Sequence, residues 1–384
     1  MGDVVEDYVE KTTVEDQYPV LTSSQRKGIV LQDDFFAGDR VNQNGNIGYF
    51  IIPRGYFAFR SRSDNDVFVF NRNDAVDMGI ISYFYPVFKP RGVDSDFLLR
   101  RLNYGLEDQI KINSEGTGQH VLSLKKFKNM IGLFPSYEEQ KKIGSYFSQI
   151  DHLITLHQRK CDETKRLKKY MLQKMFPQNG EKVPEIRFSG FTDDWEQRKL
   201  GDIGKARSGV GFPDAEQGGV TGIPFFKVSD MNLDGNENEM TVANNYVTAE
   251  QIAVHRWSPI TELPAIFFAK VGAAVMLNRK RLCRFPFLLD NNTMAYSLSS
   301  TKWDADFAKA LFGTVDLTSL VQVGALPSYN ARDVESMEIY LPSLLEQEQI
   351  GGFFKQLDTL ITLHQRELEN LQNIKKFMLG KMFV

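Results

Sequence analysis

One long segment occurs twice in this sequence, and the duplication limits the folds open to the chain. Residues 135–176 align with residues 342–383 at an offset of 207 without a gap, and 23 of the 42 aligned positions are identical. The run at residues 153–159 recurs unchanged at residues 360–366. A protein of 384 residues built in this way is predicted to consist of two halves, each of about 200 residues, that share one structural frame.

The two repeated segments are predicted to be long helices. Each begins with Pro and then a capping-box pattern, Ser136 with Glu139 and Ser343 with Glu346, and the stretches that follow, 138–176 and 345–383, contain no further proline. Apolar residues recur at spacings of three and four, which is typical of a helix with one apolar seam. A helix of about 39 residues is about 58 Å long, so we expect the two to pair antiparallel and to give the molecule pseudo-twofold symmetry. The expected seam positions are Ile143, Tyr146 or Phe147, Ile150, Leu153 or Ile154, Cys161, Leu167 and Met171 in the first copy, and Ile350, Phe353 or Phe354, Leu357, Leu360 or Ile361, Leu368, Leu371, Ile374 and Met378 in the second.

Between these segments the two halves diverge, which favours two variable domains on a common scaffold over simple drift of surface loops after duplication. The divergent regions are predicted to be mixed α/β (mixed α+β) domains. Short helices are expected at residues 95–103 and 304–312, each after an acidic start. Aromatic and β-branched runs predict strands at residues 48–52, 56–60, 66–70, 265–270 and 273–277.

These patterns give the following domain boundaries. The predicted segments are a first globular domain at 1–134, a central helix at 135–177, a linker at 178–199, a second globular domain at 200–341 and a C-terminal helix at 342–384.

Composition and motifs argue against several classes of protein. The net charge of −3 is unlike that of a histone-like polyanion binder, and the two cysteines form no CxxC pair. We find no nucleotide-binding, zinc-protease or serine-hydrolase signature. His157 and His364 occupy equivalent seam positions and are expected to set helix register rather than to bind a metal. No segment is long and apolar enough to cross a membrane, and we expect a cytoplasmic protein with neither catalytic residues nor a metal site.

Basic residues nevertheless gather in both divergent regions. Arg60 and Arg62 lie among aromatic residues in the first region, and the second contains the run at residues 278–281. Clusters of this kind neutralise DNA phosphates, and Arg and Asn also bind guanine and adenine edges in the major groove. The alternative is a solvated surface, so the prediction of DNA binding depends on the duplicated frame as well as on these clusters.

The whole pattern resembles the specificity (S) subunit of type I restriction-modification systems, similar to those of low-GC Gram-positive bacteria. The likeness rests on residues 191–202, on the duplicated helix with its Leu-Ile-Thr-Leu-His-Gln-Arg run, and on the closing Lys-Met-Phe. It covers nearly the entire chain. The first half departs from the pattern because it lacks a counterpart of residues 191–199.

The resemblance implies a protein that is not an enzyme by itself but is part of a restriction endonuclease and adenine-methyltransferase complex. Two target-recognition domains would each read one half of a bipartite, asymmetric site in double-stranded DNA, and the helices would act as a spacer. Two methyltransferase (M) subunits would dock on the helices, and two restriction (R) subunits would join for cleavage. S-adenosylmethionine, ATP and Mg²⁺ would be cofactors of these partners, and none is expected to bind to this chain.

The residues expected to do this work come from the two basic clusters and the helices. The predicted DNA-binding residues are Arg60, Arg62, Asn73, Lys270, Asn278, Arg279, Lys280, Arg281, Ser328, Tyr329 and Asn330. The predicted subunit contacts are Gln158, Arg159, Gln365 and Arg366.

Two other functions are compatible with parts of the pattern. A coiled-coil scaffold could bind proteins through two divergent domains without contacting DNA, and the salt dependence of duplex binding separates it from a DNA reader. A stand-alone nuclease or methyltransferase would need catalytic residues that the motif search does not find.

Overall fold

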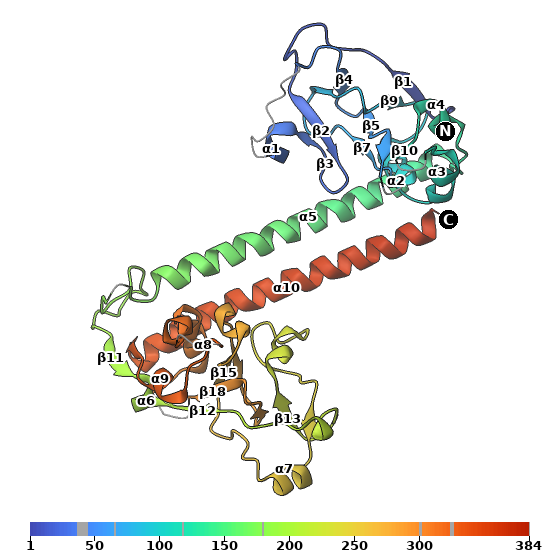
Figure 1. Ribbon diagram of the computed structural model, residues 1–384. Helices are drawn as coiled ribbons and strands as arrows, with labels where there is room; N and C mark the ends of the chain where they lie inside the picture. Colours follow the sequence, from blue (N-terminus) through green and yellow to red (C-terminus); the bar gives the residue numbers. More distant parts are fainter. Residues whose placement is uncertain are drawn as a thin grey trace. The chain divides into compact units, whose positions relative to one another are not determined.

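The chain forms two compact units. The computed structural model describes residues 1–36, 45–64, 67–116, 119–178, 180–298, 302–322 and 326–383. Unit 1 comprises Met1–His157 with Glu367–Val384, and unit 2 comprises Gln158–Arg366. Each long helix therefore begins in one unit and ends in the other (Figure 1).

Unit 1 contains a globular domain followed by the start of the first long helix. Its strands are β1 (Val5–Tyr8), β2 (Val20–Ser24), β3 (Gly28–Leu31), β4 (Phe50–Pro53), β5 (Phe57–Phe59), β6 (Arg62–Ser63), β7 (Phe70–Arg72), β8 (Met78–Ile81), β9 (Val87–Pro90) and β10 (His120–Val121). Its helices are α1 (Gln32–Phe36), α2 (Ser95–Asn103), α3 (Glu107–Asn113), α4 (Leu124–Asn129) and the start of α5 (Tyr137–Lys174).

Unit 2 contains a second globular domain followed by the start of the second long helix. Its strands are β11 (Glu196–Lys199), β12 (Lys205–Ser208), β13 (Ile223–Phe226), β14 (Tyr246–Val247), β15 (Ala265–Ala269), β16 (Lys280–Cys283), β17 (Leu288–Leu289), β18 (Thr293–Ser297) and β19 (Glu338–Leu341). Its α-helices are α6 (Leu200–Ile203), α7 (Ala249–His255), α8 (Ala305–Thr314), α9 (Ala331–Glu335) and the start of α10 (Leu344–Met382). Its 3₁₀ helices are η1 (Asp214–Glu216), η2 (Val228–Asn232), η3 (Ala273–Leu277) and η4 (Leu317–Leu320).

The two globular domains share a topology although their sequences diverge. The central sheet has the order β1-β9-β5-β7 in unit 1 and β12-β18-β15-β16 in unit 2, with antiparallel neighbours throughout. A second sheet contains a parallel pair in each unit, β2 with β8 and β13 with β17. The mixed α+β fold predicted for both domains is confirmed, and the duplication extends into regions where the sequence no longer shows it.

The repeated segments form the long helices, of 38 residues in α5 and 39 in α10. In unit 1 the Lys375 ammonium contacts the Asp151 carboxylate at 2.5 Å, and in unit 2 the Lys168 ammonium contacts the Asp358 carboxylate at 2.5 Å. Because residue numbers rise on α5 as they fall on α10 at successive contacts, the pairing is antiparallel, as predicted.

Each unit contains a joint at which three segments meet: the start of one long helix, the end of the other, and the short helix of the globular domain. In unit 2 the ring of Phe176, at the end of α5, lies 5.6 Å from that of Phe307 in α8 and 5.9 Å from that of Phe354 in α10. In unit 1 the ring of Phe383, just after α10, lies 5.4 Å from that of Phe97 in α2 and 5.9 Å from that of Phe147 in α5. The closing Lys-Met-Phe of each repeat thus anchors the helix end in a core.

The polar contacts of the two joints are also duplicated. The Gln140 side-chain oxygen accepts a hydrogen bond from the Asp94 backbone N–H, and Gln347 accepts one from Asp304 in the same way, both at 3.0 Å. Asp94 and Asp304 in turn cap α2 and α8, because their carboxylates accept from the N–H groups of Phe97 and Phe307.

In unit 2 an ion pair also joins the linker to the start of α10. Arg187 forms a bidentate ion pair with Glu346, with Nε–Oε1 at 2.7 Å and Nη2–Oε2 at 2.8 Å. The Glu346 side chain is 1% exposed and that of Arg187 is 14% exposed. The predicted helix cap is present, since the Ser343 hydroxyl accepts from the Glu346 N–H at 3.4 Å, but the Glu346 carboxylate is used for the ion pair with Arg187.

Two predicted strands are wrong. Residues 273–277 form the 3₁₀ helix η3, because Gly272 adopts a φ of 83° that ends the extended chain, and Met276 and Leu277 are exposed. In the run at residues 66–70 only Phe70 lies in a strand, and Asp66 lies outside the described residues. The predicted helix at 95–103 is confirmed, and that at 304–312 is Ala305–Thr314 with Asp304 as its cap.

Candidate nucleic-acid interface

Some of the predicted DNA-binding residues lie on equivalent connections of the two central sheets. Residues 60–69 join β5 to β7 in unit 1, and residues 270–279 join β15 to β16 in unit 2. Arg60 and Arg62 lie on the first connection, and Lys270 and Arg279 lie on the second. Two regions with little sequence likeness therefore present basic side chains from the same place in one topology.

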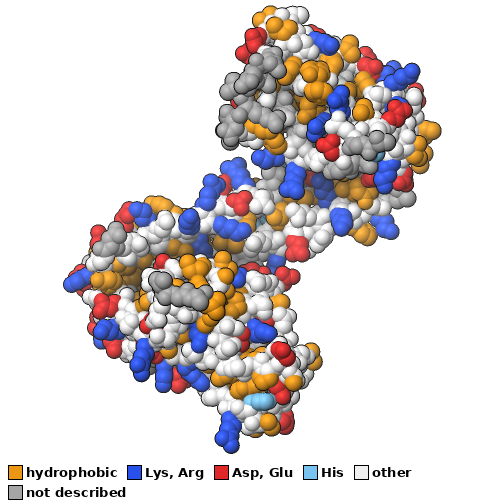
Figure 2. Space-filling view, in the orientation of Figure 1, with side chains coloured by type: hydrophobic (Ala, Val, Ile, Leu, Met, Phe, Trp, Pro, Cys, Tyr) orange, Lys and Arg blue, Asp and Glu red, His pale blue; other side chains and the backbone are white. Residues whose placement is uncertain are grey.

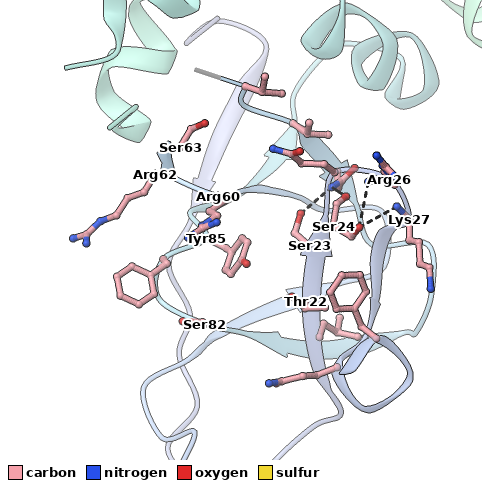
Figure 3. Close-up of a pocket in the computed structure, with 18 of the residues that line it drawn as sticks. Thr22, Ser23, Ser24, Arg26, Lys27, Arg60, Arg62, Ser63, Ser82 and Tyr85 are labelled. Atoms are coloured by element: carbon pink, nitrogen blue, oxygen red, sulfur yellow. Dashed lines mark hydrogen bonds between the residues drawn. The ribbon is translucent and has the colours of Figure 1, made fainter. Parts of the chain in front are cut away.

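A hollow of about 960 Å³ opens beside the connection in unit 1 (Figure 3). Strand β2, the turn that follows it, the β5–β7 connection and the turn between β8 and β9 all contribute to its wall. Four cationic side chains and one carboxylate line it, namely Arg26, Lys27, Arg60, Arg62 and Asp64. This balance suits a polyanion, although the chain as a whole is slightly acidic.

Hydrogen bonds hold the turn after β2 against the β5–β7 hairpin. The Ser24 hydroxyl accepts from the backbone N–H groups of Arg26 and Lys27, both at 3.2 Å. The Asn71 side-chain amide donates to the Ser23 hydroxyl at 2.8 Å and to the Ser24 carbonyl at 3.0 Å. In Figure 3 Arg60 and Tyr85 lie next to each other, and Arg26 and Lys27 lie across the hollow from Arg62.

Arg60 and Arg62 are both exposed, and within the described residues neither is paired with a carboxylate. The Arg62 guanidinium lies over the Phe84 ring, 5.0 Å from its centroid. A guanidinium held in this way keeps its N–H groups available for phosphate or guanine acceptors.

The corresponding cationic side chains in unit 2 form hydrogen bonds within their own domain. Lys280 donates to the Asn278 side-chain oxygen at 2.7 Å and to the Val315 carbonyl, and burial lowers its pKa to about 8. Arg281 donates through Nε to the Asn236 carbonyl at 2.6 Å, and burial also lowers its pKa. Arg279 is part-buried and donates to the Asn232 side chain at 2.7 Å.

Four of the residues predicted to contact DNA, Asn73, Tyr329, Asn278 and Asn330, instead use their side chains in hydrogen bonds that stabilise the fold. Asn73 is 0% exposed, and its amide donates to the carbonyls of Ile52 and Val76 at 2.9 and 3.0 Å. Tyr329 is 5% exposed and donates to the Ala269 carbonyl at 2.5 Å. Because a buried side chain with satisfied hydrogen bonds cannot reach a base without unfolding its surroundings, we correct the prediction for these two residues.

Asn278 and Asn330 are the other two. Asn278 ends η3 in a left-handed conformation, donating to the Val315 carbonyl and accepting from Lys280 and Leu317. Asn330 caps α9 by accepting from the N–H groups of Arg332 and Asp333. Ser328, two residues earlier, pairs through its backbone with Val271 and so lies beside the β15–β16 connection.

Sequence reasoning missed Arg26 and Lys27. They stand in a polar turn between two short strands, and the basic pair before Gly28, which has a φ of 73°, could have indicated an exposed basic turn. Their position opposite Arg62 depends on which strands pair, and the sequence does not show that pairing.

Comparison with known proteins decides the family. The model of the type I restriction modification DNA specificity domain matches residues 12–166 and 192–373, which is most of the chain. The chain belongs to this family.

Curated members of the specificity-domain family support this assignment at low identity. The MjaVIII specificity subunit of Methanocaldococcus jannaschii is 24% identical over 70% of this chain and 65% of its own length, so the match spans slightly less than two thirds of that relative. The putative MjaX specificity subunit of the same organism is 22% identical over 91% of this chain and 76% of its own length.

Solved structures show the same fold. The S subunit of a type I restriction-modification system from M. genitalium has a TM-score of 0.59 at 14% identity, covering 99% of this chain and 97% of its own. A chain from a structure of type I R-M complex assembly and conformational transition has a TM-score of 0.52 at 14% identity, with the same coverage.

The long helices of this specificity-domain protein expose the four residues predicted to contact other subunits. Gln158, Arg159, Gln365 and Arg366 are all exposed, and the Arg159 guanidinium forms an ion pair with Glu163 one turn further along at 2.8 Å. Figure 2 shows Lys and Arg side chains along these helices.

Some expected seam positions are exposed instead, at equivalent places in the two repeats. They are Leu167 and Ile374, each 46% exposed. At the positions expected as Leu153 or Ile154 and as Leu360 or Ile361, the leucines are 40% and 44% exposed, whereas Ile154 is part-buried and Ile361 is 8% exposed. Tyr170 and its equivalent Phe377 are also exposed. In unit 1 the contact of Lys375 with Asp151 puts Leu153 and Ile374 at one level of the helix pair, and in unit 2 Lys168 with Asp358 does the same for Leu360 and Leu167.

Searches for a membrane span and for a metal centre were both negative. Among the described residues no helix meets the length and apolarity that a membrane crossing requires, and in that same part of the chain no group of His, Cys, Asp and Glu is placed to hold a metal ion.

Proposed function

We propose that this chain gives a type I restriction-modification complex its DNA sequence specificity, each globular domain reading one half of a bipartite, asymmetric site in double-stranded DNA. The observation that carries this proposal is that the β5–β7 and β15–β16 connections are topologically equivalent, basic and different in sequence. Two domains that share one topology but differ in the sequence of these connections are suited to a DNA site whose two halves differ in sequence.

In unit 1 the readers are Arg60 and Arg62, with Arg26 and Lys27 across the hollow as phosphate contacts. A guanidinium can bind the O6 and N7 atoms of guanine in a bidentate manner, and a lysine binds phosphate as a point charge. In unit 2 the corresponding set is Lys270, Arg279, Lys280 and Arg281, with Ser328 beside them. Because hydrogen bonds already orient the last three cations, they are suited to a fixed register on the duplex.

The helices carry the contacts to other subunits and separate the readers. Two methyltransferase subunits would use the duplicated exposed pairs Leu153 with Ile374 and Leu360 with Leu167, together with Gln158, Arg159, Gln365 and Arg366. A surface that occurs twice by internal repetition suits two copies of one partner. Catalysis then belongs to the partners, which would bind S-adenosylmethionine, and two restriction subunits would bring ATP and Mg²⁺.

The experiment is adenine-methylation mapping in cells that carry this chain with a matching methyltransferase subunit. We expect a split motif that disappears when this gene is removed. Arg60→Ala with Arg62→Ala should relax or abolish one half of the motif and leave the other intact. If both halves changed equally, the assignment of one half-site to each domain would be wrong.

Duplex binding separates this proposal from a protein scaffold that never contacts DNA. The purified complex should lose affinity steeply between about 50 and 200 mM salt, in proportion to the number of phosphates contacted. A chain that co-purifies with its partner but shows no duplex binding at any salt concentration would favour the scaffold.

A further inference from the structure

An exposed aromatic pair stands on the turn between β8 and β9 in unit 1. The backbone N–H of Tyr85 donates to the Ser82 carbonyl at 2.9 Å, which closes the turn. The turn presents Tyr83, 59% exposed, and Phe84, 37% exposed. Their ring centroids are 4.3 Å apart at an interplanar angle of 41°.

Hydrogen bonds join this turn to the β5–β7 connection, which contains Arg60 and Arg62. The Phe84 carbonyl accepts two hydrogen bonds from Ser61, one from its backbone N–H at 3.0 Å and one from its hydroxyl at 2.9 Å. The Arg62 guanidinium covers one side of the Phe84 ring, and Phe84 also lines the hollow. The aromatic pair therefore has a fixed position relative to Arg60 and Arg62.

Exposed rings of this size usually mark a surface that binds something. The charge around them indicates the partner, because among the residues that the structure describes four cationic side chains and one carboxylate line the adjoining hollow. Figure 2 shows apolar side chains grouped on the visible face of unit 1 with Lys and Arg side chains at their margin. Aromatic rings beside cations match the two faces of DNA, its stacked bases and its phosphates.

We propose that Tyr83 and Phe84 form an aromatic wedge that stacks on a base step of the DNA half-site held in the hollow of unit 1. This inference rests on the proposed function and extends it, since it adds a deformation of the duplex to the basic contacts. Tyr83, the more exposed ring, makes the stacking contact. Phe84, held between Arg62 and Tyr83, fixes the angle at which Tyr83 projects. Sequence preference would then arise at the wedged step from the ease with which it unstacks.

The test uses the full chain in complex with its methyltransferase partner and a duplex that contains the mapped motif. Tyr83→Ala should weaken binding about 5- to 100-fold, whereas Tyr83→Phe, which keeps the ring, should bind like the wild type. Because no charge is removed, the slope of log affinity against log salt should stay unchanged in Tyr83→Ala. Lys27→Ala, which removes a proposed phosphate contact, should instead reduce that slope by about one. Tyr137→Ala is the matched control, since Tyr137 is 48% exposed in the same unit but lies at the start of α5 and not on the β8–β9 turn.

A fluorescent base analogue reports the stacking directly. With 2-aminopurine placed in turn at each step of the half-site, the wild type should increase the emission at one step, and Tyr83→Ala should not. Phe84→Leu, which preserves most of the volume of a partly buried side chain, should give an intermediate increase. Thermal unfolding of each variant by circular dichroism identifies any that fails to fold, including Tyr83→Ala, which removes the contacts of the Tyr83 ring with the rings of Phe84 and Tyr49.

The outcomes separate this inference from the proposed function. Wild-type complex that does not bind the duplex contradicts the proposed function. Wild-type complex that binds while Tyr83→Ala binds equally well, with no emission change at any step, contradicts the wedge alone. A loss of partner co-purification in Tyr83→Ala would overturn the wedge in favour of a protein contact.

Discussion

The two joints are built alike, whereas the two basic connections are built differently. Both joints use a Gln that receives the backbone N–H of a capping Asp, and both end in a Phe that packs on the short helix. The connections share only their place in the sheet, since that of unit 1 exposes its cations and that of unit 2 binds them internally. The comparison shows that the two repeats stay alike where the domains are attached to the helices, and that they differ at the two connections that we propose to read DNA.

The largest expected effect concerns the ion pair of Arg187 with Glu346 in unit 2, for which the described part of unit 1 shows no counterpart at Glu139. Arg187→Met leaves the Glu346 carboxylate buried without its partner, so unit 2 should lose about 3–5 kcal/mol of unfolding free energy in urea denaturation. The equivalent residue in unit 1, Glu139, is exposed, and Glu139→Gln should change stability by less than about 0.5 kcal/mol. The double change Arg187→Met with Glu346→Leu should recover most of the loss. Equal effects at Glu139 and Arg187 would show that the joints differ less than their burial indicates.

A smaller effect is expected at the glycine that both joints share. A Cβ on Gly351 would lie 2.3 Å from the Asp304 carboxylate oxygen and 2.5 Å from the Phe307 nitrogen, and a Cβ on Gly144 would lie 2.5 Å from Asp94 and 2.8 Å from the Phe97 nitrogen. Alanine at either position should cost about 1–3 kcal/mol.

The neighbouring glycine supplies the control for this comparison. A Cβ on Gly352 meets no described atom within 4 Å, so Gly352→Ala should stabilise the helix by up to about 1 kcal/mol. If Gly351→Ala were as stable as Gly352→Ala in the same denaturation assay, the close approach of α8 to α10 would be disproved.

The smallest expected effect tests the internal binding of cations in unit 2. Burial lowers the pKa of Lys280 to about 8, from 10.5 in the unfolded chain. Between about pH 8 and pH 10.5 the Lys280 side chain is protonated more fully in the unfolded chain than in the folded chain. The unfolding free energy of the wild type, relative to that of Lys280→Met, should therefore rise with pH across this window. Because Lys280 is only part-buried, we expect a gain of about 1 kcal/mol between pH 7 and pH 10. If the stability difference between the wild type and Lys280→Met did not change with pH, the Lys280 ammonium would be solvated rather than buried.

The sequence predicts the frame well because a helix is determined by local spacing. The long helices, the short helices and the capping residues Asp94 and Asp304 all follow from periodicity and from residue types that act over a few positions. The strand predicted at residues 273–277 fails because a run of apolar residues does not show that Gly272 turns the chain.

The site is harder to predict because it depends on pairing between distant strands. Arg60 and Arg62 could be chosen from local composition, but Arg26 and Lys27 come to the same hollow only through the pairing of β2 with β8. Asn73 has a residue type suited to base reading, yet its 0% exposure is a property of the folded core alone. The sequence therefore indicates which residue types are suited to DNA contact, but it does not show which of those side chains are exposed in the folded protein.

The joints bind the globular domains through the main chain. Gln140 and Gln347 take backbone N–H groups, and Gly144 and Gly351 leave room for the backbone nitrogens of Phe97 and Phe307. From the domain's own side chains, this attachment uses a capping Asp, an aromatic residue three positions later and one cation, Arg100 with Asp151 in unit 1 and Lys309 with Asp358 in unit 2. The long helices thus provide the same attachment site twice. A domain with a different surface can occupy this site while the helices keep their sequence.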